Sequence, residues 1–235
     1  MTRRRWIAER VQGDRAWLTG SNADHLARVL RAKPGQQFEV AVEGSVRVGT
    51  IVSVSPDQVE FQLGEAVQHS PLPELSIVLS IFKFDRLEWA LEKLTELGVA
   101  RIIPVISRRT EQHLAQAAEK RVQRWRKLAV EAAQQSRCLA PPEIAAPVRL
   151  KNALHTITGC RIVLSEQETS VHLKSAVKEC TPPIILAFGP EGGWTPEEIQ
   201  LFNDNGWISA SLGSTILRAE TAAIAAVAIT VTELS

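Results

Sequence analysis

The feature that most restricts the fold of this chain is the alternation of strand-like and helix-like segments after residue 74. Short runs of β-branched and apolar residues predict buried strands at residues 75–82, 99–106, 161–165, 184–188 and 207–212. Segments with helical spacing separate most of these runs. Because parallel strands need a long connection, usually a helix, the alternation predicts a parallel sheet with helices on both faces.

Several helices in this region can be placed from the residues at their ends. Asp85 and Glu88 predict a capping pair at the start of one helix, which Gly98 ends. A long basic helix is expected at residues 117–137, before a pair of prolines, and an alanine-rich helix at residues 219–233. These helices complete the prediction of an α/β domain.

Residues 1–72 have a different pattern. Alternating or β-branched runs, separated by turn residues, predict strands at residues 38–42, 46–54 and 59–63. A short helix is expected at residues 23–31, and the proline-containing segment 70–73 predicts a connector. Small strand-rich units are usually barrels or half-barrels. We therefore expect a small β-barrel domain at residues 1–72 and an α/β domain at residues 73–235.

Charge is unevenly distributed along the chain, although the net charge is only +1. Lysine and arginine outnumber acidic residues by eight to three in residues 1–33 and by nine to three in residues 101–137. Residues 34–72 hold one basic and five acidic residues. Two basic segments on a nearly neutral chain predict a phosphate-binding surface for nucleic acid. Solvated helix faces would give the same pattern, so both interpretations stay open at this stage.

Composition and motifs argue against several classes of protein. No apolar run approaches the roughly 20 residues needed to cross a bilayer, and the basic N-terminus lacks the apolar stretch of a signal peptide. Three widely spaced cysteines without a CxxC motif predict neither a disulfide framework nor a zinc site. The Rossmann, P-loop, serine-hydrolase and zinc-protease motifs are missing from the sequence. We therefore expect a cytoplasmic protein that contacts no membrane and holds no metal.

Two loops carry the residues best suited to bind a ligand. Residues 189–193 (GPEGG) follow the strand at 184–188 and precede a helix that Thr195 is expected to cap. Residues 211–221 (SLGSTILRAET) follow the strand at 207–212 and lead into the last helix. Because parallel α/β sheets bind ligands at the carboxyl ends of their strands, both loops are expected at one site. Ordinary turn chemistry is the alternative explanation of either loop alone.

The two loops, read as GPEGG and SLGxxILRAETA, resemble those of the RsmE family of SPOUT methyltransferases. Further segments resemble the family in the same order, so that the resemblance covers nearly the whole chain: His25–Arg31, Lys83–Arg86, Lys93–Val99, Ser107–Thr110 and Glu131–Ser136. One departure lies at Arg137 and Cys138, where members of the family often have glycine and arginine.

The resemblance implies a particular fold, reaction and set of partners. The fold is a SPOUT α/β domain with a parallel sheet and a deep trefoil knot, a rare exception among protein folds, behind a PUA-like β-barrel that docks RNA. The reaction is methyl transfer from S-adenosylmethionine to N3 of a uridine in 16S ribosomal RNA. The partner is that RNA or the assembled small ribosomal subunit, and the family is usually homodimeric.

Candidate site residues follow from the loops and the resemblance together. Arg218 is the candidate catalytic cation because an anionic uracil needs a lasting positive charge, and Glu220 either anchors Arg218 or caps the final helix. The cofactor is expected to contact Leu164, Phe188, Gly189, Pro190, Glu191, Gly192, Gly193, Leu212, Gly213, Ile216, Leu217, Arg218 and Thr221. RNA is expected to contact Arg5, His25, Arg28, Arg31, Lys83 and Arg109.

Two other functions fit the sequence. SPOUT folds share their cofactor loops across substrates, so the chain can equally act on another base or on a transfer RNA. A non-catalytic RNA-binding protein is the other alternative, in which both glycine-rich loops are structural and no cofactor binds.

Overall fold

The computed structural model describes residues 5–42, 44–67, 74–155 and 157–234. The chain forms two compact units, residues 1–71 with 130–141 and residues 72–129 with 142–235. The predicted connector at residues 70–73 lies outside the described residues, so the division into domains at residues 72 and 73 stays a prediction. Each unit is described by itself.

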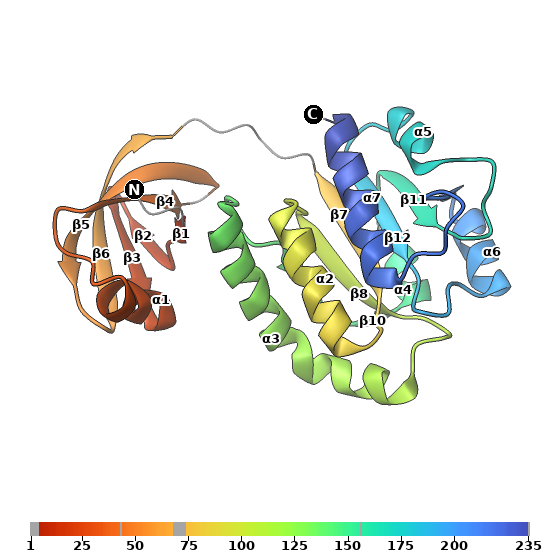
Figure 1. Ribbon diagram of the computed structural model, residues 1–235, viewed down its shortest axis with the longest axis horizontal. Helices are drawn as coiled ribbons and strands as arrows, with labels where there is room; N and C mark the ends of the chain where they lie inside the picture. The colour runs from red at the N-terminus through yellow and green to blue at the C-terminus, as the bar shows by residue number, and fades with distance from the viewer. Residues whose placement is uncertain (1–4, 43, 68–73, 156, 235) are drawn as a thin grey trace. The chain divides into compact units, whose positions relative to one another are not determined.

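The first unit is built on a curled six-stranded sheet (Figure 1). Its strands are β1 (Trp6–Ile7), β2 (Arg10–Gln12), β3 (Arg15–Thr19), β4 (Gln37–Val42), β5 (Ser45–Val54) and β6 (Gln58–Ala66). They lie in the order β1-β4-β5-β6-β3-β2. Residues 6–7 pair with β4 and residues 10–12 pair with β3, so one short stretch joins both edges of the sheet. The sheet thus closes as a small barrel, as expected, and closure leaves few unpaired backbone groups.

The barrel core consists of large apolar side chains. Trp6, Leu18 and Phe61 are fully buried, and each buried side chain of this size contributes about 1.5–3 kcal/mol. The helix expected at residues 23–31 is an α-helical turn, α1 (Gly20–Asp24), followed by a π-helical turn, η1 (His25–Val29).

The second unit contains a parallel sheet, as the alternating pattern predicts (Figure 1). Its strands are β7 (Leu75–Ser80), β8 (Arg101–Ile106), β9 (Glu143–Ile144), β10 (Val148–Arg149), β11 (Cys160–Leu164), β12 (Ile184–Phe188) and β13 (Ile208–Ala210). The order is β10-β8-β7-β12-β11-β13, with β9 also paired to β8. Every pair is parallel, so the carboxyl ends of all strands lie at one edge.

Helices cover both faces of this sheet. One face packs against α2 (Phe84–Glu96), α3 (Gln112–Ser136), α5 (Leu173–Lys178) and α7 (Ala219–Leu234). The other packs against α4 (Leu150–Leu154) and α6 (Pro196–Asp204). Successive residues of β7 show the division, because Ile77 belongs to the first core and Val78 to the second. The α/β class predicted from the sequence is confirmed.

The capping pair predicted at the start of α2 is wrong. The helix begins at Phe84, and its N-cap residue is Lys83, which makes no capping hydrogen bond through its side chain. Glu88 instead accepts hydrogen bonds from Arg121 and Arg124 of α3, at 3.2 and 2.9 Å. The Glu88 carboxylate therefore binds arginines of the neighbouring helix α3 and does not cap its own helix.

The chain before α7 is held against an earlier loop. Ser165 donates its backbone N–H to the carbonyl of Ala210 (3.0 Å), and Ser211 donates to the carbonyl of Val171 (2.9 Å). Leu173 in turn donates to the carbonyl of Ser211 (2.9 Å). These bonds hold the C-terminal segment against residues 165–172. Such contacts are expected of the knotted SPOUT fold, in which the C-terminal segment is threaded past this loop.

The expectation that the cysteines form no disulfide is wrong. Cys160 at the start of β11 and Cys180 after α5 are joined, with their Cα atoms 5.6 Å apart, because the fold brings together two residues 20 positions apart. In the part of the chain that the structure describes, no three His, Cys, Asp or Glu side chains gather in a way that would hold a metal ion. None of the described helices is long and apolar enough to span a bilayer.

Candidate active site

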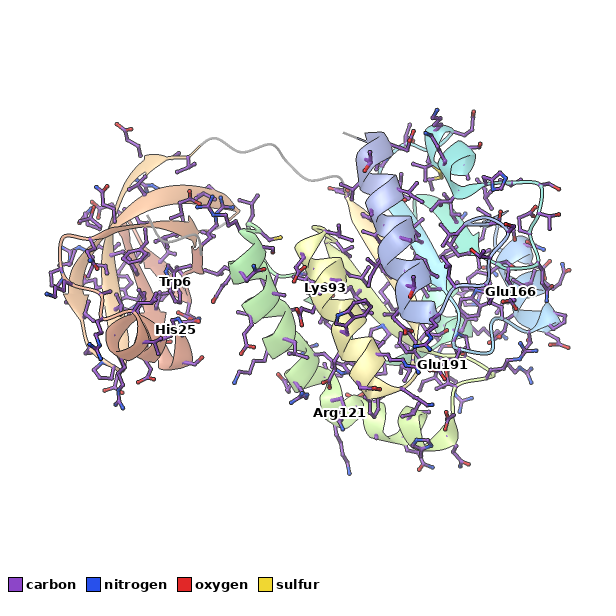
Figure 2. All side chains as sticks on the ribbon, viewed as in Figure 1. Trp6, His25, Lys93, Arg121, Glu166 and Glu191 are labelled. Carbon is purple, nitrogen blue, oxygen red and sulfur yellow. A yellow bond between two sulfur atoms is a disulfide. The ribbon has the colours of Figure 1, made fainter. Side chains whose placement is uncertain are left out.

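A pocket lies at the carboxyl ends of three parallel strands in the second unit. The segments that follow β11, β12 and β13 supply most of its lining, and Figure 2 labels Glu166 and Glu191 from two of them. The cavity volume is about 140 Å³. This is the edge at which open parallel sheets bind their ligands, so the two loops chosen from the sequence do meet at one site.

Glycines let the loop after β12 turn tightly. A Cβ atom on Gly189 would lie 3.3 Å from backbone atoms of both Gly193 and Trp194. Gly193 has a φ of +69°, in the left-handed region that favours glycine, and its N–H donates to the carbonyl of Pro190 (2.8 Å). Side chains at these positions would therefore displace the backbone that faces the pocket.

Trp194 anchors the end of this loop. Its indole N–H donates to the carbonyl of Leu164 at 3.1 Å, which links the ends of β12 and β11. The Trp194 ring packs edge to face on Phe202 (4.8 Å between centroids), and Phe202 packs in the same way on Trp207 (5.0 Å). A buried aromatic row therefore supports one wall of the pocket.

The helix after the loop is capped as predicted. Thr195 and Glu198 form a reciprocal capping box, with bonds of 3.3 and 2.9 Å. Glu198 is buried and also accepts the backbone N–H of Arg108 at 2.8 Å. This carboxylate fixes the start of α6 and ties it to the segment after β8.

Two acidic residues around the pocket find a partner on a different helix. Arg86 of α2 pairs with Glu191, a lining residue, at 2.6 Å, and lies 3.9 Å from Glu220. Glu220 is buried in the first turn of α7, and its Oε2 atom has no hydrogen-bond partner among the described residues. Among those residues the ion-pair partner of Glu220 is Arg86 and not Arg218. Glu166, also a lining residue, makes no ion pair there.

Arg218 stands exposed between two lining residues, Leu217 and Ala219. Within the described part of the chain its side chain forms neither an ion pair nor a hydrogen bond, so its charge is available to a ligand. Ile216, which also lines the pocket, is 82% exposed. An apolar side chain so exposed beside a cavity is suited to cover a bound molecule.

Most of the predicted cofactor residues line this pocket. Those that do are Leu164, Phe188, Gly189, Pro190, Glu191, Gly193, Leu212, Gly213, Ile216 and Leu217. Those that do not are Gly192, Arg218 and Thr221. Sequence reasoning missed Ser165, Glu166, Gln167, Trp194, Ser211, Ser214, Thr215, Ala219 and Ala222. The first three follow β11 directly, so their position after a buried strand was a usable signal. The roles of all these residues in cofactor binding stay predictions.

Two of the predicted RNA contacts lie near the pocket. Lys83 is exposed at the start of α2, the helix that carries Arg86. Arg109 is also exposed, and its guanidinium donates to the carbonyl of Gly192. Both side chains therefore have charge at the surface close to the loops.

The other four predicted RNA contacts belong to the first unit. Arg28 and Arg31 are exposed, and Arg28 pairs with Asp24 at 2.8 Å. His25 is half-buried, with its ring 5.8 Å from that of Trp6.

Arg5 is placed differently from these residues. It is buried, pairs with Glu39 at 3.0 Å, and donates to the carbonyl of Arg137. Arg137 has a φ of +64° at the end of α3, a conformation that suits the glycine often found there in the resembled family. The contacts of Arg5 thus link β4 to the end of α3 within the first unit.

Comparison with known families defines the class of protein. Residues 68–231 match the RNA methyltransferase domain, and residues 18–64 match the RNA methyltransferase PUA domain. The first match alone covers well over half of the chain. The fold and the pocket are thus those of an RNA methyltransferase with a PUA domain in front of its α/β domain.

Individual relatives define the family. The chain is 32% identical to ribosomal RNA small subunit methyltransferase E of Synechocystis, over 90% of this chain and 71% of that protein. It is 30% identical to the protein of the same name from Bacillus subtilis, over 87% and 85%. The chain belongs to the family of ribosomal RNA small subunit methyltransferase E.

Solved structures agree with this assignment. A ribosomal RNA small subunit methyltransferase E from Neisseria gonorrhoeae, bound to S-adenosyl methionine, is 26% identical and superposes with a TM-score of 0.86, covering 97% of each chain. A methyltransferase from Legionella pneumophila in complex with the same cofactor is 27% identical, with a TM-score of 0.82 over 97% of this chain and 95% of that one.

The residues of the pocket fit S-adenosylmethionine. Among the described residues its lining includes two carboxylates, Glu166 and Glu191, and no lysine, arginine or histidine, which suits a cofactor with a positively charged sulfur. Phe188, Leu212 and Leu217 supply apolar surface for a flat base. Glycines give a ligand access to backbone N–H and carbonyl groups.

Proposed function

We propose that this protein transfers a methyl group from S-adenosylmethionine to N3 of a uridine in the 16S RNA of the small ribosomal subunit. The observation that carries the proposal is the pocket formed by the loops after β11, β12 and β13, beside Arg218, which is exposed and pairs with no acidic residue in the described part of the chain. Membership of the family supports the class of reaction. The choice of N3 rests on the resemblance of the two loops to the RsmE family.

The chemistry assigns a task to each part of the site. S-adenosylmethionine supplies a methyl group on a positively charged sulfur, and the uracil loses its N3 proton as the new N–C bond forms and the S–C bond breaks. Water or the RNA takes this proton. Arg218 stabilises the anionic uracil, because its guanidinium has no ion-pair partner among the described residues and stays charged at any working pH. The loop around Gly193 orients the reactants, and positioning supplies much of the rate enhancement in such a displacement.

RNA binding is assigned to each unit separately. In the first unit Arg28 and Arg31 provide exposed charge for phosphates, with His25 beside them. In the second unit Lys83 and Arg109 provide charge near the pocket. The double variant R28E/R31E is expected to weaken RNA binding while S-adenosylmethionine binding stays unchanged. Equal RNA affinity of this variant and the wild type would contradict the docking role.

The protein is proposed to act as a homodimer in the cytoplasm, where its RNA substrate is found. The apolar helix α7 supports dimerisation, because Ile224, Ala225 and Ala228 are only partly buried within one chain. Trp89 on the neighbouring helix α2 is 48% exposed. Light scattering coupled to size-exclusion chromatography measures the mass, and a monomer at micromolar concentration would contradict this point.

The proposed function is tested by methyl transfer from labelled S-adenosylmethionine to small subunits from cells that lack the modification. Label recovered as 3-methyluridine is the expected result. Label in another nucleoside would overturn the target and keep the enzyme class. Absence of both label and cofactor binding in calorimetry would favour the non-catalytic RNA-binding protein.

A further inference from the structure

Three charged residues around the pocket compete for partners. Glu191 lines the cavity, Glu220 begins α7, and Arg218 lies two residues before Glu220. Because both loops end at the same pocket, Arg218 could pair with either acid. An arginine held in such a pair would be less available to an anionic substrate, because its positive charge would already be neutralised.

Arg86 removes this competition. Its Nη1 atom is 2.6 Å from Glu191 Oε1, and its Nε atom is 3.9 Å from Glu220 Oε1. Arg86 lies on α2, which packs beside α7 (Figure 1). Its side chain therefore meets the acidic residues of both loops from an element outside them. The Arg86 side chain is 32% exposed, whereas the side chain of Glu220 is only 7% exposed.

The burial of Glu220 makes a cation necessary at this place. A carboxylate removed from water is costly unless a positive charge or hydrogen bonds compensate it, and the Oε2 atom of Glu220 has no partner among the described residues. Only Arg86 among those residues pairs with it. If Arg86 were lost, Arg218, which is the nearest cation to Glu220 along the chain, would be the replacement ion-pair partner of Glu220.

We propose that Arg86 is a positioning residue that occupies Glu191 and Glu220 and thereby keeps Arg218 free for the anionic base. Arginine suits the task because its forked guanidinium reaches two carboxylates at once, which the single ammonium of lysine does less well. The inference rests on the proposed function, since it assigns the free charge of Arg218 to the methylated uracil. It also explains why Arg86, which contacts the acidic residues, is a different arginine from Arg218, which is expected to meet the substrate.

The test compares R86Q, R86K and the triple variant R86Q/E191Q/E220Q. R101Q is the matched control, because Arg101 pairs with Glu143 (3.3 Å) and starts β8 at the opposite end of the strands. Steady-state methylation of small subunits gives kcat and KM, and calorimetry gives the Kd of S-adenosylmethionine. R86Q is expected to lower kcat at least tenfold with little change in the KM for RNA, and R86K to fall between R86Q and wild type. R101Q is expected to match wild type.

Replacing Glu191 and Glu220 by glutamine distinguishes the proposed role of Arg86, which is to keep these carboxylates away from Arg218, from a role in which Arg86 only stabilises the loop. At saturating S-adenosylmethionine, which offsets any loss of cofactor affinity caused by E191Q, the triple variant is expected to recover kcat relative to R86Q, because neither Glu191 nor Glu220 is left to bind Arg218. A kcat for R86Q within twofold of wild type, or no recovery in the triple variant, would overturn the proposal.

A second measurement covers the case in which R86Q does not fold. Phenylglyoxal labelling of Arg218, read by peptide mass spectrometry, is expected to be slower in R86K than in wild type. Equal labelling would overturn the role of Arg86. Failure of wild type itself to methylate small subunits would instead overturn the proposed function, so the two failures are distinguishable.

Discussion

Replacement of Gly193 by alanine should damage both stability and cofactor binding. Its φ of +69° is disfavoured for a residue with a Cβ atom by roughly 1–2 kcal/mol. The added Cβ would also lie 3.3 Å from Oε1 of Glu166, which must move aside. We therefore expect a loss of about 1–2 kcal/mol, or about 3–6 °C in Tm for a chain of this size.

The same strain should reach the cofactor. If the backbone rotates to relieve it, the bond from the Gly193 N–H to the Pro190 carbonyl lengthens and the pocket wall shifts. A distortion of about 1.4 kcal/mol in the bound state corresponds to a tenfold higher Kd for S-adenosylmethionine. Thermal unfolding followed by circular dichroism gives Tm, and calorimetry gives Kd.

The neighbouring glycine provides the control for this prediction. Gly192 does not have a positive φ, and an added Cβ would meet only Cδ of the Arg109 side chain, at 3.2 Å, which can move. G192A is therefore expected to change stability by less than about 0.5 kcal/mol. Equal Tm and Kd for G193A and wild type, or equal damage from G192A, would refute the reasoning from backbone conformation.

Three further predictions concern single side chains. F202A should lose about 3–5 kcal/mol in urea unfolding, because the ring is fully buried between two tryptophans; a loss below 1 kcal/mol would contradict the packing argument. E166Q should lower the ratio of the affinities for S-adenosylmethionine and for its demethylated product, whose sulfur is neutral, by about two- to fivefold in calorimetry, because an exposed carboxylate that lines the pocket is removed. An unchanged ratio would show that this carboxylate does not interact with the charge on the sulfur. Hydrogen bonds from the N–H groups of Ser170 and Val171 lower the pKa of Glu168. Their stabilising effect is present above the ordinary glutamate pKa and lost as pH falls through the lowered value. The protection factors of both amides, which are corrected for the intrinsic exchange rate at each pH, should therefore fall in acid, and E168Q should abolish this pH dependence.

The sequence alone determined the local structure around the site. The strand predicted at residues 184–188 has those bounds in the structure, and Thr195 caps the next helix as expected. These features depend on neighbours along the chain, namely apolar residues in a row and a hydroxyl three positions before a glutamate. The GPEGG loop was found for the same reason, since glycine marks a backbone conformation wherever the fold places it.

Local spacing does not show the partners that charged side chains find far away in the sequence. Glu88 has the position of a capping residue, yet it accepts hydrogen bonds from Arg121 and Arg124 of α3. Arg5 was chosen as an RNA contact, which stays a prediction, and the structure shows it buried and paired with Glu39 of β4. In both cases tertiary packing brings a charged side chain to its partner, and the spacing of residues along the chain does not predict such a contact.

Only the tertiary structure decided how the charges of the pocket are shared. Arg86 and Glu191 are 105 residues apart, and no pattern in the sequence links them. Their contact arises because α2 packs beside α7 and the parallel sheet brings the ends of its strands to one edge. The sequence indicated the two loops that line the pocket, since their glycines mark local backbone conformations. The structure decided which arginine is free, because ion pairing depends on distances that only folding sets.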